Sequence, residues 1–169
     1  MKIRLASDLM FDSIVDGLGM RIVIWTQGCL FNCEKCHNPQ THDVNGGALY
    51  DIDELVERIV KYPLKSGVTL SGGDPFYQLD ETKYLTEQLK KHNINIWAYS
   101  GDIYEHMIDP NNPLSAKTIE IIRNVDILID GPFIFSLADM SLHFRGSSNQ
   151  RIIDVQKSLM EKKTIIADI

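Results

Sequence analysis

Short β-branched runs alternate along this sequence with stretches of helical spacing, and Gly-rich or polar loops separate them. A chain built this way places successive strands side by side and packs the intervening helices against them. The alternation therefore predicts an α/β fold with a mostly parallel sheet and right-handed crossovers. The predicted strands are Met20–Thr26, Gly67–Ser71, Asn95–Ser100, Val125–Ile129 and a terminal run, Thr164–Ala167.

Apolar residues at helical spacing predict the connecting helices. One helix begins after Asp51, which is spaced from Glu54 as in a capping box, and it ends before Pro63. A second is expected over Asp80–His92, and a third ends near Val125. A complete eight-stranded barrel needs about 250 residues. The 169 residues here predict one domain, residues 1–169, with a partial (β/α) barrel of five to six parallel strands.

Charge and apolar patterning exclude several classes of protein. Asp and Glu outnumber Lys and Arg by 23 to 17, which argues against a protein that neutralises nucleic-acid phosphates. The apolar runs are strand-sized, far too short to cross a bilayer. An odd number of cysteines and the lack of a secretory leader argue against a disulfide scaffold. We therefore expect a cytoplasmic protein in a reducing compartment.

The unusual loops all come directly after predicted strands. They are Gly28–Pro39, Gly72–Pro75, Ser100–Asp102 and Asp130–Pro132. Ligands of α/β proteins bind at the carboxyl ends of the strands, so these four loops are expected to converge on one site. The loop at Asp130 is equally consistent with a ligand contact and with a helix cap.

The first of these loops carries all the cysteines of the chain, Cys29, Cys33 and Cys36, within eight positions. Thiolates gathered on one short loop suit zinc or an iron–sulfur cluster. A four-iron cluster usually takes four thiolates, so one iron would lack a protein ligand here. The alternatives are a structural zinc ion with His37 or His42 as the fourth ligand, and a thiol redox switch.

The C-x3-C-x2-C spacing resembles the defining motif of the radical S-adenosylmethionine superfamily. The resemblance implies a partial-barrel fold and a [4Fe–4S] cluster in which Cys29, Cys33 and Cys36 each hold one iron. It further implies that S-adenosylmethionine chelates the fourth iron through its methionyl amino and carboxylate groups. One electron from the cluster would then break a carbon–sulfur bond and yield a 5′-deoxyadenosyl radical.

Other loops add to this resemblance. The run Gly72-Gly73-Asp74 resembles the superfamily's "GGE" element, which receives the amino end of S-adenosylmethionine, although such a run is also a good turn sequence. Ser100 follows the third predicted strand and is a candidate contact for the nucleoside or the methionyl carboxylate. Lys35 stands where the superfamily commonly has an aromatic residue near the adenine, and the neighbouring His37 is a second candidate for that contact.

Two later segments, Asp130–Phe133 and Phe144–Arg151, resemble the family that activates anaerobic ribonucleoside-triphosphate reductase, a group of glycyl radical enzyme activases. The resemblance implies hydrogen abstraction from a glycine Cα of that reductase, with electrons from a low-potential donor such as flavodoxin or ferredoxin. The cofactor carries this chemistry, so no protein acid or base is assigned.

Three alternatives to this reading remain at the level of sequence. The chain could activate another glycyl radical enzyme, such as pyruvate formate-lyase, or modify a small molecule. It could also be a zinc-stabilised interaction module without catalysis.

The segment Arg145–Gln150 has no metal-ligand or nucleophile pattern. We expect it to dock the partner or to order the site, and a polar capping loop is the alternative.

Overall fold

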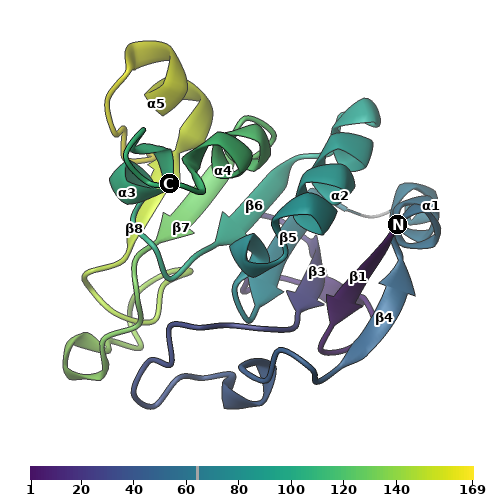
Figure 1. Ribbon diagram of the computed structural model, residues 1–169, viewed down its shortest axis with the longest axis horizontal. Coiled ribbons are helices and arrows are strands. Elements are labelled where there is room, and N and C mark those ends of the chain that lie inside the picture. Colours follow the sequence, from purple (N-terminus) through teal and green to yellow (C-terminus); the bar gives the residue numbers. More distant parts are fainter. Residues whose placement is uncertain (64) are drawn as a thin grey trace.

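The computed structural model describes residues 1–63 and 65–169, which form a mixed sheet with helices packed along it (Figure 1). The strands run in the order β4-β1-β3-β5-β6-β7-β8, and β2 also pairs with β3. They are β1 (Lys2–Leu5), β2 (Met10–Ser13), β3 (Arg21–Thr26), β4 (Ala48–Asp51), β5 (Gly67–Gly72), β6 (Ile96–Tyr99), β7 (Ile127–Asp130) and β8 (Arg151–Asp154). The helices are α1 (Ile52–Lys61), α2 (Leu79–Lys91), α3 (Tyr104–Ile108), α4 (Ser115–Ile122) and α5 (Val155–Glu161).

The parallel part of the sheet consists of β3, β5, β6 and β7. The prediction of a mostly parallel α/β sheet is confirmed. The predicted number of five to six parallel strands is wrong, because four strands pair in parallel within the described residues. Strands β1 and β2 pair antiparallel with β3, β4 pairs antiparallel with β1, and β8 returns antiparallel to β7. The segment between β7 and β8 has no α-helix to cross the sheet, so the chain comes back in the opposite direction.

Side chains alternate between two very different faces of the parallel strands. One face carries a fully buried apolar row that includes Ile24, Leu70, Ala98 and Leu128 in register. Helices α1, α2, α4 and α3 lie side by side, each packed on the next, and their apolar faces join this row in one core. The Asp51 carboxylate accepts hydrogen bonds from two amides of the first turn of α1, as expected of an N-cap.

The opposite face carries aromatic and polar side chains, and loops cover it. Arg21 is only 2% exposed, and its guanidinium donates to Thr69 Oγ1 at 2.7 Å and to the Val68 carbonyl at 2.8 Å. Its guanidinium carbon lies 5.1 Å from the centre of the Trp97 ring, and the Phe144 ring meets Trp97 edge-on at 5.4 Å. Burial lowers the pKa of Arg21 to about 10, so the side chain is still charged at neutral pH.

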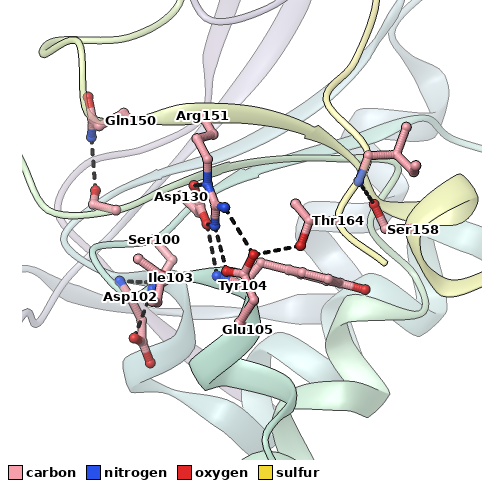
Figure 2. A network of polar contacts seen from close by, with 12 residues as sticks. Ser100, Asp102, Ile103, Tyr104, Glu105, Asp130, Gln150, Arg151, Ser158 and Thr164 are labelled. Carbon is pink, nitrogen blue, oxygen red and sulfur yellow. Dashed lines mark hydrogen bonds and ion pairs between the residues drawn. The ribbon is translucent and has the colours of Figure 1, made fainter. Parts of the chain in front are cut away.

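A polar network at the end of β7 fixes the segment that follows it (Figure 2). Asp130 is 1% exposed and accepts from Arg151 and from the Tyr104 backbone N–H at 2.8 Å. Arg151 also donates to both carboxylate oxygens of Glu105, at 3.0 and 2.7 Å. The Thr164 hydroxyl donates to Glu105 at 2.6 Å. Of the two readings of Asp130 in the sequence, the structure shows the structural one, because its carboxylate joins β7, β8 and α3.

The terminal strand predicted at Thr164–Ala167 is wrong. This segment meets β8 through one antiparallel bridge, between Ile166 and Ile153. Ile166 is more than half exposed, so the run lacks the alternating burial that would favour a longer strand. Within the described residues, no helix is long and apolar enough to span a membrane.

We predict that Arg21→Met lowers the free energy of unfolding by about 2–4 kcal/mol, because it leaves several buried oxygens without their donor. Urea denaturation at pH 7 measures the change. The matched control is Arg58→Met, which removes an exposed ion pair with Asp8 and should cost no more than about 1 kcal/mol. Equal losses in the two variants would contradict the importance assigned to the buried guanidinium.

We also predict a pH-dependent contribution from Glu105. Its hydrogen bonds from Arg151 lower its pKa to about 2 in the folded protein. The stabilisation is therefore complete above the ordinary pKa of a glutamate and is lost as the pH falls toward about 2. Urea unfolding should show Glu105→Gln about 1 kcal/mol less stable than wild type at pH 7, with the gap closing below about pH 4.5.

The control for this experiment is Glu161→Gln, an exposed residue whose one ion pair in the described part of the chain is with Lys163. It should change stability at pH 7 by no more than about 0.5 kcal/mol. A Glu105→Gln deficit that stays constant from pH 7 to pH 3 would show that packing, and not the ion pair, stabilises this network.

Candidate functional site

One cavity of about 450 Å³ lies at the carboxyl ends of the parallel strands. It is lined by residues of all four loops that the sequence singled out, which confirms that these loops converge. The residues from these loops are Cys29, Phe31, Cys33, Cys36, His37, Asn38, Gly72, Gly73, Asp74, Ser100, Gly101 and Gly131. A cavity of this size suits a cofactor-sized ligand.

The three cysteines are free thiols, all half-buried, and all line this cavity. Their loop is held at its start by two backbone hydrogen bonds, from Gly28 N–H to the Thr41 carbonyl at 2.8 Å and from Cys29 N–H to the His42 carbonyl at 3.3 Å. Burial raises the pKa of the Cys29 thiol, so ionisation is costly at this position in the absence of a bound cation. The loop thus presents three soft sulfur ligands to one space.

The structure bears on the kind of metal group that these cysteines fit. Within residues 1–63 and 65–169, no three His, Cys, Asp or Glu side chains surround a point that a single metal ion could occupy. The His37 ring packs on Phe133 with ring centres 4.7 Å apart. Three thiols that open onto one cavity fit a polynuclear group in which each sulfur ligates a different metal atom.

The Gly72-Gly73 turn lies against the start of the cysteine loop so closely that no side chain would fit. A Cβ on Gly73 would lie 2.4 Å from the Gly28 carbonyl oxygen, and one on Gly72 would lie 2.5 Å from the Thr26 carbonyl oxygen. Gly72 also has a φ of +99°, which favours glycine. The Asp74 N–H donates to the Gly28 carbonyl at 2.9 Å and joins the two loops.

Asp74 lies in the cavity wall, and its carboxylate already has partners. One oxygen accepts from the Ser100 hydroxyl at 3.0 Å and from the Gly101 N–H at 2.9 Å. The other accepts from the Phe76 N–H at 2.8 Å. Burial raises the pKa of this 4%-exposed acid, while the three donated hydrogen bonds oppose the rise. Asp74 therefore fixes the turn after β6 to the turn after β5.

Lys35 is a candidate contact that the structure places outside the cavity lining. Its Nζ lies 3.8 Å from the centre of the Phe135 ring, in the segment between β7 and β8. A cation over an aromatic face is a favourable contact, so this lysine connects the cysteine loop to that segment. The neighbouring Cys36 and His37 do line the cavity.

Sequence reasoning missed several lining residues. Trp25 and Tyr99 project from β3 and β6 on the same sheet face as Ser71, so the two-residue period of the strands could have identified them. Burial raises the pKa of Tyr99, whose hydroxyl donates to the Phe144 carbonyl at 2.8 Å. Phe133 and Phe144 also line the cavity, but nothing in their local pattern indicates that they fold back over the sheet. Three residues of the segment expected to dock the partner or to order the site, Arg145, Gly146 and Gln150, line it too.

Comparison with known proteins agrees with this site. A family model described as a 4Fe-4S single cluster domain matches residues 15–153. Anaerobic ribonucleoside-triphosphate reductase-activating proteins of Enterobacteria phage T4 and Escherichia coli K12 are 33% and 32% identical to the chain. Their alignments cover 82% and 81% of this chain, and 86% and 90% of the relatives.

A pyruvate formate-lyase-activating enzyme of Staphylococcus epidermidis is 30% identical over 88% of this chain, but the alignment covers 60% of that enzyme. The matched region of the family model contains the cysteine loop, the Gly-Gly turn and the segment between β7 and β8. The chain therefore belongs to the 4Fe-4S single cluster domain family, together with the anaerobic ribonucleoside-triphosphate reductase-activating proteins.

Proposed function

We propose that the chain is a radical S-adenosylmethionine enzyme that generates a glycyl radical on anaerobic ribonucleoside-triphosphate reductase. One observation carries the proposal. Cys29, Cys33 and Cys36 open onto the same cavity as the glycine turn after β5 and the Ser100–Gly101 turn after β6. Two relatives, of whose length the alignments with this chain cover 86% and 90%, are named activating proteins of this reductase.

In this proposal the three cysteines hold a [4Fe–4S] cluster, and S-adenosylmethionine occupies the rest of the cavity. Together these groups would supply one-electron cleavage of the nucleotide's carbon–sulfur bond, with the electron from the donor, to give methionine and a 5′-deoxyadenosyl radical. The Gly72-Gly73 turn, which lies directly on the start of the cysteine loop and lines the cavity, receives the amino end of the nucleotide in this proposal. Ser100 and Gly101 line the cavity next to it, and Asp74 holds their turn in place by accepting hydrogen bonds from the Ser100 hydroxyl and the Gly101 N–H.

The chain's other residues orient the nucleotide and exclude water. Trp25, Phe31 and Phe133 provide apolar walls, and the Phe31 ring packs directly on Gly101, where an added Cβ would lie 2.5 Å from it. His37 borders the adenine in this proposal, whereas Lys35, outside the cavity lining, connects the cysteine loop to Phe135. The sheet acts as a partial barrel within one domain, residues 1–169, and its open end admits a glycine-bearing loop. A low-potential flavodoxin or ferredoxin of the cytoplasm is the proposed electron donor.

Pyruvate formate-lyase is the second candidate partner, favoured by the similarity to its activating enzyme. The reductase is preferred because the chain matches 86–90% of the length of the reductase activators and 60% of that activating enzyme. If the chain were instead a zinc-stabilised interaction module, the purified protein would contain zinc in place of iron and sulfide.

We predict that anaerobically reconstituted protein contains iron and acid-labile sulfide and, with reductant and S-adenosylmethionine, produces a glycyl radical on the reductase detectable by electron paramagnetic resonance. Cys33→Ala should lose the absorbance of the cluster, because one iron loses its thiolate ligand. Its rate of 5′-deoxyadenosine formation should fall by at least about 100-fold. Colourless zinc-loaded protein, or full activity of Cys33→Ala, would refute the proposal. A glycyl radical that forms on pyruvate formate-lyase but not on the reductase would make pyruvate formate-lyase the partner.

Asp74→Asn tests the connection between the two turns. The amide NH2 faces groups that donate hydrogen bonds, so the Ser100–Gly101 turn should shift while the cysteine loop keeps its cluster. We expect unchanged iron content and about tenfold weaker binding of S-adenosylmethionine, measured by equilibrium dialysis. Asp80→Asn, which removes an exposed pair with Lys117, is the control and should bind normally. Wild-type affinity in Asp74→Asn would remove Asp74 from the proposed positioning role.

A further inference from the structure

The segment between β7 and β8, residues 131–150, closes on itself at its base. The Gln150 side chain donates to the Gly131 carbonyl at 3.0 Å, and its Oε1 accepts from two backbone amides of the same segment at 2.9 and 3.2 Å. The Asn149 side chain donates to the Pro132 carbonyl at 2.8 Å. These two side chains join the outgoing limb of the segment to the returning one, so they fix its shape.

The middle of this segment, residues 134–142, which we call the tip, is mostly apolar. Its large exposed apolar side chains are Ile134, Phe135, Leu137 and Met140. Met140 is fully exposed. Asp139 is the one charged residue among these nine, whereas 24% of the whole chain is charged. Exposed apolar side chains that gather on one loop, instead of lying scattered over the surface, mark an interaction site.

The tip begins and ends at the cavity wall. Phe133 precedes it and Leu142 is its last residue, and both line the cavity. The Lys35 Nζ, 3.8 Å from the centre of the Phe135 ring, connects the tip to the cysteine loop. That loop has two exposed apolar side chains of its own, Leu30 and Phe31. Figure 1 shows both segments extending beyond the ends of the parallel strands on the same side. An apolar surface thus borders the cavity.

Charge decides between a membrane and a protein as the group that covers this surface. Apolar side chains that enter a membrane surface are typically accompanied by several basic ones. The charged residue of the tip is the acidic Asp139, and the whole chain carries a net charge of −6. A surface rich in aromatic residues and methionine and poor in charge is instead typical of the core of a protein interface.

The proposed function indicates which protein is bound, because the glycine to be activated must enter the cavity that the tip borders. We propose that the tip is the surface on which the anaerobic reductase docks, through an apolar patch beside its glycine-bearing loop. The inference rests on the proposed function. It assigns partner contact to residues 134–142, and it assigns Arg145–Gln150 the role of ordering them.

The experiment places a charge in the tip and measures the affinity for the reductase. Dissociation constants are measured anaerobically by biolayer interferometry with cluster-loaded wild type, Met140→Glu and the matched control Met160→Glu, which alters an exposed methionine of α5. Met140→Glu should weaken binding at least about tenfold, and Met160→Glu should stay within about twofold of wild type. Without reductase, all three should contain equal iron and form 5′-deoxyadenosine equally fast, because Met140 lies outside the cavity lining.

An affinity of Met140→Glu within about twofold of wild type would overturn the proposal. Equal weakening in Met160→Glu would also overturn it, because the change in net charge would then explain the loss. If Met140→Glu instead abolishes self-association of the isolated chain, seen by light scattering, and still binds the reductase normally, the tip contacts a second copy. If wild type forms no cluster or places no radical on the reductase, the proposed function itself fails. Normal activation by both wild type and Met140→Glu removes only the docking surface.

Discussion

The alternation of side chains along four parallel strands is the constraint on which the structure depends. In register, one row of aliphatic residues is sealed beneath the helices, and this leaves the other row free to be aromatic and polar. Trp25, Ser71 and Tyr99 belong to that second row and form the floor of the cavity. A shift of one residue in any strand would exchange the two rows, so the core and the site are determined together.

The rim of the cavity is assembled by contacts between loops that are far apart in sequence. Asp74 connects the turns after β5 and β6, Gly73 lies on the cysteine loop, and Lys35 connects that loop to Phe135. The segment between β7 and β8 is held at its base by Asp130 and Arg151. Each loop contains little regular secondary structure, and contacts with the neighbouring loops fix its conformation. The site therefore depends on all of these loops together and not on any one motif.

The sequence predicts those parts of the fold that repeat a local pattern. Strands β3, β5, β6 and β7 have β-branched runs followed by glycine, and the convergence of their loops follows from parallel topology. Strands β1, β2, β4 and β8 are four residues each and partly polar, and they depend on a neighbour that the local sequence does not identify. The short run at Ile166 has an apolar pattern but meets β8 through a single bridge, and Ile166 is more than half exposed.

Side-chain roles were harder to predict than the placement of loops. Asp74 is in the expected turn, but only the structure shows that its carboxylate is already engaged by three donors. Arg145 lies within a polar run of the sequence, and only the structure shows that it lines the cavity while its Nε is buried without a hydrogen-bond partner. The Ser100 and Gly101 donors of the buried Asp74 carboxylate come from a distant part of the chain, and sequence spacing carries no information about such partners.

The contact between Thr164 and Glu105 has a structural consequence. It joins the last residues of the chain, through Arg151, to the strand end from which the cavity's far wall departs. A substitution that removes the Thr164 hydroxyl would therefore loosen one support of Glu105, and Glu105 in turn holds the guanidinium that ties β8 to the end of β7.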